Sequence, residues 1–260
     1  MNTKIPDFKM PSIDLNCDMG ESFGAWRMGN DRALMEYVSS VSIACGFHAG
    51  DASVIRNTVE SAIEKGVAIG AHPSFPDLQG FGRREMKMSA REIFDIVLYQ
   101  TAAVKGICEA FGARLHHVKP HGALYNQAAK NAETAAAIAE AVKAIDSSLI
   151  LYGLSGSFLI SEAEKIGLKT ASEVFADRTY RADGNLTPRS EPNALIEDVN
   201  AAIKQVLQMV KTQTVTATNG ETVQIRAETI CIHGDGANAL DFARTINAKL
   251  RENGISVQTL

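Results

Sequence analysis

Short hydrophobic segments alternate along this chain with longer segments in which hydrophobic residues recur every three or four positions. The short segments have the length and composition of buried strands, and the longer ones have the period of amphipathic helices. Strands are expected at residues 13–17, 41–45, 67–71, 115–118, 149–152, 170–174 and 229–232, with a weaker candidate at 255–257. Strands that alternate with helices in this way predict βαβ units and a parallel sheet.

The segments between the strands have recognisable helix ends. Asp51 is placed to cap the helix that follows it, and Gly66 is placed to end that helix. Ser89 and Glu92 have the spacing of a capping box, and their helix is expected to run to about Phe111. Helices are therefore expected at 51–65, 89–111, 132–145, 156–166, 193–211 and 236–252.

One segment departs from the βα pattern. Residues 214–226 alternate between hydrophobic and polar positions about Asn219 and Gly220, and an Asn-Gly pair is a strong hairpin signal. We expect an antiparallel β-hairpin near 212–226, inserted between the last long helix and the strand at 229–232. It carries no convergent catalytic groups, so a structural role is favoured over docking of a partner.

The pattern as a whole predicts one α/β domain that covers residues 1–260. The chain is 45% hydrophobic and 22% charged, as an ordinary globular protein is. α/β barrels routinely reach about 250 residues as a single domain. We therefore expect a (β/α) barrel of seven or eight strands, not necessarily regular, with the hairpin as an insertion.

Charge and hydrophobicity narrow the expected partners and location. The formal net charge is −4 and the isoelectric point is near 5.9, which argues against a nucleic-acid or anionic-membrane partner. No hydrophobic run approaches the roughly 20 residues of a membrane span, and the first 18 residues lack the hydrophobic core of a signal peptide. A cytoplasmic protein is expected.

The four cysteines, Cys17, Cys45, Cys108 and Cys231, show no CxxC pairing and no zinc-ribbon spacing. Three of them end short hydrophobic runs, where a small thiol is commonly buried. We expect buried, reduced cysteines, with a redox or nucleophilic role as the less favoured alternative.

Polar residues of unusual type lie at or just after the carboxyl ends of the expected strands. In an α/β barrel these strand ends meet at one mouth, where active sites are built. The residues expected there are Asp18, Glu21, His48, His72, Lys119, His121, Glu173, Asp177, Arg178, His233 and Asp235. Several separate strands that each deliver His, Asp, Glu or Lys to one rim predict an active site at the barrel mouth.

The first strand carries three polar residues at alternate positions, Asp14, Asn16 and Asp18. In a regular strand these side chains point to the same side, which would be the barrel interior. Buried carboxylates need partners, so an internal polar network is the alternative to a catalytic role, most of all for Asp14.

Four histidines each follow a different strand: His48, His72, His121 and His233. A single histidine in such a place is usually structural, but four together favour binding or acid/base chemistry. Asp14 with His48 and His72 is a plausible ligand set for zinc or a similar ion. No local motif such as HExxH accompanies it, so no required metal is the favoured expectation.

Cationic side chains suggest an anionic substrate. Lys119, Arg83 and Arg178 lie in turn-rich polar segments, whereas Arg84 fits a solvated surface position equally well. No GxxxxGK[ST] or GxGxxG motif is present. The loop 153–157 precedes a helix and its amides could hold an anion, but a plain helix cap explains it equally well.

Seven segments resemble one known family, LamB/YcsF. They are DLNCDMGES (14–22), ACGFHAGD (44–51), GAHPSFPD (70–77), GFGRR (80–84), KPHGALY (119–125), EVFADRTY (173–180) and IHGD (232–235). These segments spread over nearly the whole chain, and several are long enough to be specific.

This resemblance implies a barrel related to carbohydrate deacetylases and certain glycoside hydrolases. It implies an ATP-dependent hydrolase that cleaves the cyclic amide 5-oxo-L-proline to L-glutamate in a complex with 5-oxoprolinase subunits B and C. ATP, with Mg²⁺, is then the cofactor. Because the chain has no nucleotide motif, we expect ATP to be handled mainly by the partners or at a shared interface.

That chemistry assigns roles to the residues at the barrel mouth. Asp18 or Glu21 is the expected general base, and His48 or His72 the expected acid. Lys119 and Arg178 are expected to hold the substrate carboxylate or the phosphoryl group. The further substrate-binding candidates are Asp14, Asn16, Arg83, His121, Glu173, Asp177, His233 and Asp235.

The sequence leaves two other functions open. A stand-alone metal-dependent amide or N-acetyl hydrolase would use Asp14, His48 and His72 as ligands. A non-catalytic scaffold for partner subunits is the other alternative, although a scaffold has no need of His and Asp around a barrel mouth.

Overall fold

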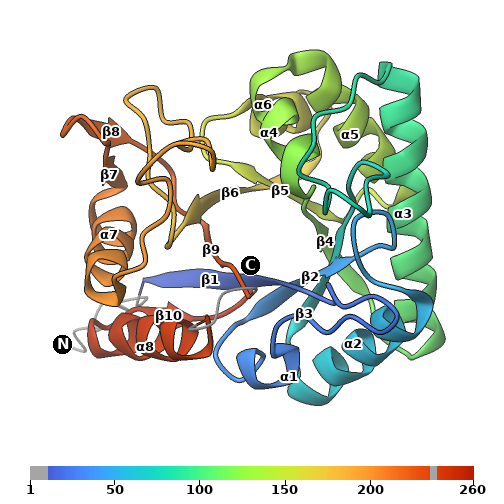
Figure 1. Cartoon of the computed structure of the whole chain (residues 1–260), viewed down its shortest axis with the longest axis horizontal. Coiled ribbons are helices and arrows are strands. Elements are labelled where there is room, and N and C mark those ends of the chain that lie inside the picture. Colours follow the sequence, from blue (N-terminus) through green and yellow to red (C-terminus); the bar gives the residue numbers. More distant parts are fainter. Residues whose placement is uncertain (1–10, 235–238) are drawn as a thin grey trace, which may run out of the picture.

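The strands form a closed parallel barrel in the computed structural model, which describes residues 11–234 and 239–260 (Figure 1). Each strand pairs in parallel with its neighbours around the ring. The ring consists of β1 (Ser12–Met19), β2 (Ser40–Ala44), β3 (Ala68–His72), β4 (Leu115–Val118), β5 (Ile150–Leu154), β6 (Lys169–Phe175) and β9 (Thr229–Ile232). The predicted parallel sheet and its strand positions are confirmed.

Strand β9 closes the barrel, because it pairs with β6 on one side and with β1 on the other. Thr229 of β9 is the register partner of both Asp14 of β1 and Glu173 of β6. The weak strand expected near the carboxyl end is β10 (Ser256–Val257), which pairs with Ser12 and Ile13 at the start of β1. It lies beside the ring rather than within it, so the barrel has seven strands.

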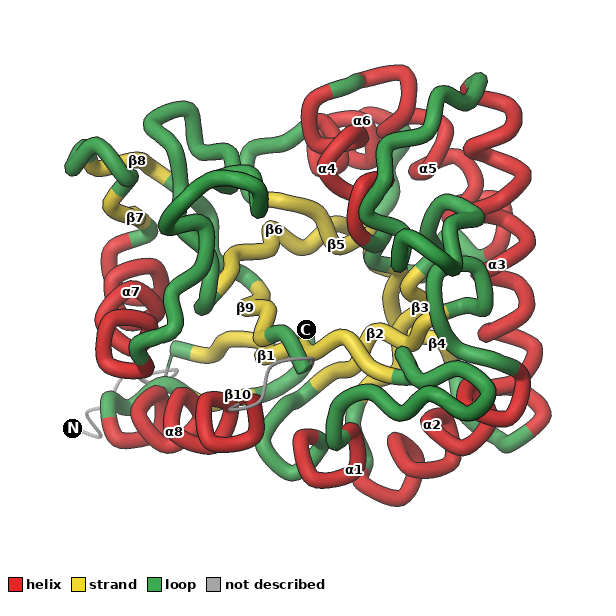
Figure 2. Tube along the Cα trace, in the orientation of Figure 1, coloured by secondary structure: helices red, strands yellow, loops and turns green. Residues whose placement is uncertain are grey.

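Helices surround the barrel, as Figure 2 shows. They are α1 (Asp31–Leu34), α2 (Ala52–Lys65), α3 (Ala90–Ala110), α4 (Gly122–Lys130), α5 (Ala132–Ile145), α6 (Phe158–Lys165), α7 (Val199–Thr212) and α8 (Ala239–Glu252). The predicted caps are present: the Asp51 carboxylate accepts hydrogen bonds from two amides of α2, and Ser89 and Glu92 form a capping box on α3. None of the described helices is long and hydrophobic enough to cross a membrane.

The helix expected at 193–211 begins later than predicted, at Val199. Residues 193–197 are held instead by the loop after β6: Arg178 and Thr179 both donate to the Ala194 carbonyl, and Asn193 has a left-handed backbone with φ of 63°. The Asp198 side chain then caps α7. For the helix expected at 236–252, the first three positions lie outside the described residues, and α8 covers the rest.

Helix α4 was not expected. It begins at Gly122, directly after the polar segment that follows β4, and its cap residue His121 makes no side-chain capping bond. The usual sequence signals of a helix start are therefore missing. Its position matters for function because it carries Tyr125 into the barrel mouth.

The predicted hairpin is confirmed as β7 (Thr214–Thr216) and β8 (Thr222–Gln224), which pair antiparallel. Gly220 in its turn has φ of 86°, a left-handed conformation that glycine adopts without strain. The amide of Thr218 donates to the carbonyl of Tyr180 over 2.8 Å. The hairpin thus supports, from outside, the loop that follows β6.

The barrel interior is polar, whereas the space between barrel and helices is hydrophobic. Along β1, Leu15 and Cys17 belong to the hydrophobic core, while across the ring Asp14 accepts from Tyr152 and Asn16 accepts from Lys119. The predicted alternation is therefore confirmed. Gly70 of β3 lies inside against the His117 ring, where an added Cβ would come within 2.1 Å of Nε2.

Candidate active site at the barrel mouth

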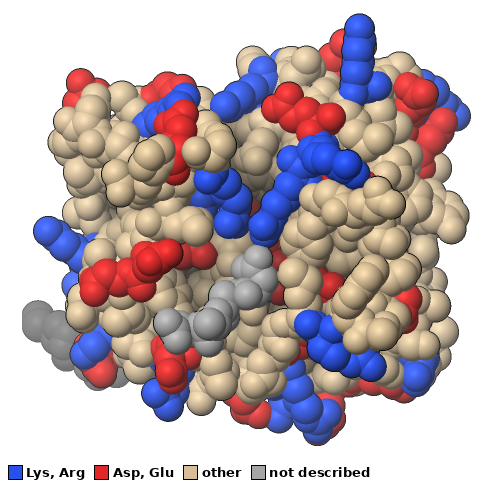
Figure 3. Space-filling model, in the orientation of Figure 1, with Lys and Arg blue, Asp and Glu red and all other residues tan. Residues whose placement is uncertain are grey.

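A pocket of about 400 Å³ opens at the carboxyl ends of the barrel strands. Basic side chains gather around a hollow near the middle of this face, as Figure 3 shows. The expected site residues that line the pocket are Asp18, Glu21, His72, Arg83, Lys119, His121, Glu173, Arg178 and His233. Residues that follow five different strands thus reach one cavity, as the sequence pattern requires.

Lys119, directly after β4, is the central cation of the pocket floor. Its ammonium lies 2.5 Å from Asp18 Oδ1, 2.8 Å from Asn16 Oδ1 and 3.1 Å from Glu173 Oε1. Burial alone would lower its pKa, but Asp18 and Glu173 hold the pKa well above the ordinary value. Lys119 is therefore a permanent cation that organises two carboxylates, and its donors are already engaged.

Asp18, near the end of β1, lies between two basic partners. Its Oδ1 contacts Lys119, and its Oδ2 lies 3.3 Å from Nε2 of His72. Burial raises the pKa of this carboxyl, but the interactions with His72 and Lys119 outweigh it and place the pKa well below its usual range. Asp18 is thus an ionised carboxylate that faces the pocket.

Glu173 of β6 is fully buried and is hydrogen-bonded on both carboxylate oxygens. Oε1 accepts from Asn16 and Lys119, and Oε2 accepts from the Tyr125 hydroxyl over 2.7 Å. Burial, followed by the charge of Glu173, raises the Tyr125 pKa well above its ordinary value, so the phenol keeps its proton. Three donors therefore fix one carboxylate at the pocket wall.

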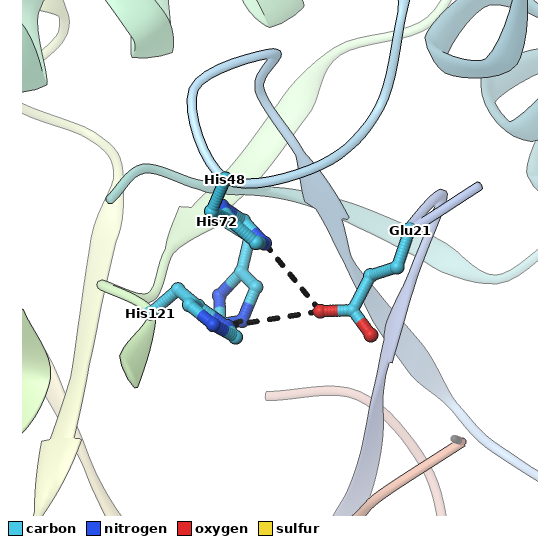
Figure 4. Close-up of side chains that lie close together, drawn as sticks. All are labelled: Glu21, His48, His72 and His121. Carbon is cyan, nitrogen blue, oxygen red and sulfur yellow. Dashed lines mark hydrogen bonds and ion pairs between the residues drawn. The ribbon is translucent and has the colours of Figure 1, made fainter. Parts of the chain in front are cut away.

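Three imidazoles and one carboxylate converge beside this pocket, as Figure 4 shows. His72 Nε2 lies 2.9 Å from His121 Nδ1, and Glu21 Oε1 lies 3.4 Å from His48 Nε2 and 3.7 Å from His121 Nδ1. The rings of His48 and His121 stack with centroids 3.8 Å apart. Burial is the main cause that lowers the pKa of His48 and of His121 well below the ordinary value.

A turn at Phe81 and Gly82 covers this histidine cluster. The Phe81 carbonyl accepts from His121 Nε2 over 2.9 Å, and Gly82 has φ of 63°. An added Cβ at Gly82 would lie 2.9 Å from His48 Cβ and from His121 Cδ2. The glycine therefore lets the main chain approach the two rings closely.

On the opposite side of the pocket, the His233 ring lies between the Asp177 carboxylate and the Arg189 guanidinium. Its Nδ1 lies 2.7 Å from Asp177 Oδ2, and its Nε2 lies 2.9 Å from Arg189 Nη2. A guanidinium can only donate, so Nε2 accepts and the ring proton is on Nδ1, directed at Asp177. Asp177 itself does not line the pocket, and Asp235 lies outside the described residues.

Of the three arginines considered in the sequence, Arg178 and Arg83 line the pocket and Arg84 does not. Arg178 is buried and donates to the carbonyls of Thr187 and Ala194, and burial lowers its pKa to about 10. The Arg83 guanidinium lies 4.9 Å from the Phe81 ring centroid and lines the pocket. Arg84 instead pairs with Asp77 and does not line the pocket.

Three expected site residues lie behind the pocket wall rather than in it. Asp14 accepts from Ser40, Tyr152 and Thr229 deep in the barrel, so it belongs to an internal hydrogen-bond network. Asn16 bridges Lys119 and Glu173, and neither it nor Asp14 lines the cavity. His48 is buried behind the other two histidines, without direct access to the pocket.

The residues that could hold a metal therefore differ from the expected set. Among the described residues, ligand atoms of Glu21, His48, His72 and His121 lie within 4.8 Å of one another, and Asp14 is not among them. A second group consists of Asp18, Cys231 and His233. The sequence pattern identified the histidines but not the fact that Glu21 is the carboxylate that joins them.

Several pocket residues were missed by sequence reasoning, among them Tyr125 and Arg189. Tyr125 stands in the KPHGALY segment, one turn into the unpredicted helix α4. Arg189 lies in the irregular segment before α7 and reaches His233 from there. The Tyr125 position would follow from recognising α4, whereas no periodic signal marks Arg189.

The cysteines are all buried and free, as expected. Burial raises the pKa of each thiol, and Cys231 contacts Lys119 in the site, with Sγ 3.3 Å from the ammonium. Neutral buried thiols are poor nucleophiles.

Comparison with known proteins adds an independent line of evidence. Residues 13–260 match the LamB/YcsF family. The A subunit of 5-oxoprolinase from Bordetella parapertussis is 59% identical over 248 residues, which cover 95% of this chain and 98% of that protein. The crystal structure of the lactam utilization protein from Thermus thermophilus has a TM-score of 0.91 at 46% identity, covering 96% of this chain and 100% of that one.

A more distant likeness concerns the fold alone. A family 4 carbohydrate esterase from Streptomyces lividans has a TM-score of 0.52 at 12% identity, over 96% of this chain and 92% of that one. This agrees with the expected barrel fold. The family match covers nearly the whole described chain, and its motif segments supply the walls of the pocket. The chain belongs to the LamB/YcsF family.

Proposed function

We propose that this chain is the lactam-opening subunit of an ATP-dependent 5-oxoprolinase, which converts 5-oxo-L-proline to L-glutamate with hydrolysis of ATP to ADP and phosphate. The proposal includes partner subunits B and C. Support comes from the relatives named as the A subunit of 5-oxoprolinase and as a lactam utilization protein. The observation that carries it is the pocket floor, where Asp18 and Glu173 converge on Lys119.

The reaction is difficult because ring opening must overcome amide resonance. Phosphorylation of the lactam oxygen by ATP removes much of this resonance and activates the ring carbon. Attack of water on that carbon then gives a tetrahedral intermediate, and the C–N bond breaks as the ring nitrogen takes a proton. This leaves the opened chain as an acyl phosphate, and a second water molecule hydrolyses it to L-glutamate and phosphate. The protein must hold the lactam, accept a proton from water and return one to nitrogen.

Asp18 fits the proton-transfer role in this scheme. It faces the pocket as an ionised carboxylate, so it can accept a proton from the attacking water and pass it to the leaving nitrogen. Its low pKa makes it a weak base, which suits an electrophile that ATP has already activated. Lys119 then acts as a positioning residue, because its ammonium is engaged by Asp18, Asn16 and Glu173.

Anion recognition falls to cations nearer the rim of the pocket. Arg83, Arg178, Arg189 and Lys130 line the cavity together with the rest of the loop at 185–190. Guanidinium groups bind carboxylates and phosphoryl oxygens in a fork. These residues are the proposed ligands of the lactam carboxylate and of the transferred phosphoryl group.

The test is glutamate production from 5-oxoproline by the three-subunit complex, with ATP and each subunit omitted in turn. Glutamate is expected only when ATP and all subunits are present. Asp18→Asn should lower the rate at least about 100-fold, whereas Asp95→Asn, at an exposed position of α3, should leave it unchanged. Glutamate formation by this chain alone without ATP would contradict the proposal.

Nucleotide handling has its own test. We propose that ATP binds mainly to the partners or at an interface with them. The chain has no GxxxxGK[ST] motif and no GxGxxG motif, the two common phosphate-binding loops. Calorimetric titration of the isolated chain with Mg-ATP should give no heat of tight binding, while the complex should bind. Micromolar binding to the isolated chain would overturn this part.

The alternative function, a stand-alone metal-dependent amide or N-acetyl hydrolase, keeps one supporting observation: the cluster of Glu21, His48, His72 and His121. It requires chelator-sensitive hydrolysis by this chain without ATP. The same omission experiment therefore separates the two functions.

A further inference from the structure

We propose that Glu21, His48, His72 and His121 bind a single divalent transition-metal ion of the zinc class. The four side chains lie at or just after the ends of four different strands, β1 to β4, and point toward one another beside the pocket (Figure 4). Three imidazoles and one carboxylate are a donor set that zinc and related ions prefer, in the number that a four-coordinate site needs.

The first argument is the facing pair of His72 and His121. His72 Nδ1 lies 2.7 Å from the Lys119 carbonyl, and His121 Nε2 lies 2.9 Å from the Phe81 carbonyl. A carbonyl only accepts, so both of these nitrogens carry protons. In the neutral rings, His72 Nε2 and His121 Nδ1 therefore direct lone pairs at each other across 2.9 Å.

Two lone pairs at this separation repel unless a positive centre lies between or beside them. A second proton on His72 or a bound metal ion can fill this role. The outer contacts are those of a metal site, because histidine ligands usually donate the other ring nitrogen to a carbonyl or carboxylate that fixes the tautomer. Both rings already have such a contact, so they are oriented as metal ligands.

His48 provides an independent observation that a second proton on His72 does not explain. It is 1% exposed, and neither of its ring nitrogens has a hydrogen-bond partner among the described residues. The distance of 3.4 Å from Nε2 to Glu21 Oε1 is longer than an ordinary N–H···O bond. Leaving a buried polar side chain without a bond costs stability, so an imidazole aimed into this cluster points to a further ligand.

The second cluster, Asp18, Cys231 and His233, is a poorer metal site. The Lys119 ammonium already lies 2.5 Å from Asp18 and 3.3 Å from Cys231 Sγ, so a fixed cation occupies the space between these two groups. A divalent ion added there would be repelled by Lys119. In the histidine cluster, Glu21 offers a carboxylate oxygen to the ion instead.

A metal in the histidine cluster would border the pocket, because Glu21, His72 and His121 line it. An ion there supplies Lewis acidity toward a carbonyl or phosphoryl oxygen. This catalytic use depends on the proposed function, but the binding itself does not, and the experiment below needs no turnover.

The test uses the purified full chain, stripped of metal with a chelator and then titrated with Zn²⁺ and with Co²⁺. Calorimetry should show one ion per chain, and bound Co²⁺ should give the intense visible bands of a four-coordinate site. His48→Gln should weaken zinc binding at least about 10-fold. His116→Gln, a partly exposed histidine on β4, and His233→Gln should leave it unchanged.

X-ray absorption of the zinc-loaded wild-type chain keeps the test valid if a variant fails to fold. The spectrum should show nitrogen and oxygen ligands at about 2.0–2.1 Å, with imidazole scattering and no sulfur. Absence of stoichiometric binding would overturn the proposal. So would a sulfur ligand, or loss of binding in His233→Gln but not in His48→Gln, since either assigns the ion to the Cys231 cluster.

Discussion

The Lys119 ammonium lies 2.5 Å from Asp18 Oδ1 and 3.1 Å from Glu173 Oε1, so a single cation bridges two carboxylates of the barrel interior. The three residues come from β4, β1 and β6, which are not neighbours in the ring. Lys119 therefore links strands across the barrel and prepares the site at the same time. Its removal should affect both stability and activity.

Lys119→Met is expected to lower the free energy of unfolding by about 3–5 kcal/mol, because it leaves buried carboxylates without their cation. Ring opening by the complex should be lost as well, since Asp18 loses its position. Urea unfolding at neutral pH measures the first effect. Lys65→Met, which removes a surface ion pair with Glu36, is the control and should cost less than about 1 kcal/mol. A Lys119 variant as stable as this control would refute the assigned role.

Tyr125→Phe removes one of the three donors of Glu173 without changing the shape of the side chain much. The buried Oε2 atom then lacks this bond, and we expect a loss of about 1–3 kcal/mol in the free energy of unfolding. The rate of ring opening should fall less than in Asp18→Asn. Tyr99→Phe, at an exposed position of α3, serves as the control, and equal effects of the two variants would count against a special role for Tyr125.

The strands and most helices could be predicted because local signals and the final packing agree. The strands at 115–118 and 229–232 match β4 and β9 residue for residue. The alternation along β1 correctly placed Asp14, Asn16 and Asp18 inside. The early start predicted for α7 failed for a non-local reason: Arg178, from the loop after β6, holds the Ala194 carbonyl and keeps 193–197 out of the helix.

The site was only partly predictable from the sequence. A polar residue of a strand reaches the pocket only if it lies near the carboxyl end of that strand. Asp14 and Asp18 look alike in sequence, yet Asp14 lies deep among hydroxyl donors and Asp18 lies at the mouth. The pairing of Glu21 with three histidines depends on four loops meeting in space. Arg189 reaches the site from an irregular segment, which has no periodic pattern from which its position could be inferred.

Gly82→Ala should displace the rings of the histidine cluster, because the added methyl group would lie against them. A Cβ there would overlap Ser74 Oγ at 2.3 Å and press on His48 and His121. We expect weaker zinc binding and slower ring opening, in addition to the cost of about 1–2 kcal/mol for a left-handed alanine. Gly24→Ala is the matched control, because Gly24 also has a left-handed backbone but has no described atom within 4 Å of the added Cβ. Its zinc binding should equal that of the wild type, and the same result for Gly82→Ala would contradict the packing argument.

The pair of Asp177 and His233 predicts how stability depends on pH. Burial raises the pKa of Asp177, but His233 and Arg189 outweigh burial and lower the pKa below its ordinary value. A carboxyl whose pKa is lower in the folded state stabilises the fold above its unfolded pKa of about 3.9. That contribution is lost as the pH falls through the folded pKa.

Asp177→Asn should therefore reduce the free energy of unfolding by about 1–3 kcal/mol at pH 7, and the difference from wild type should shrink below about pH 4. Urea unfolding of both proteins between about pH 3 and pH 8 measures this directly. Asp95→Asn, whose wild-type side chain pairs with Arg91 on the surface of α3, should change stability by less than about 1 kcal/mol throughout. A difference for Asp177→Asn that grew as the pH fell below about 4 would have the wrong sign, and the stabilising role of the ionised Asp177 carboxylate would have to be abandoned.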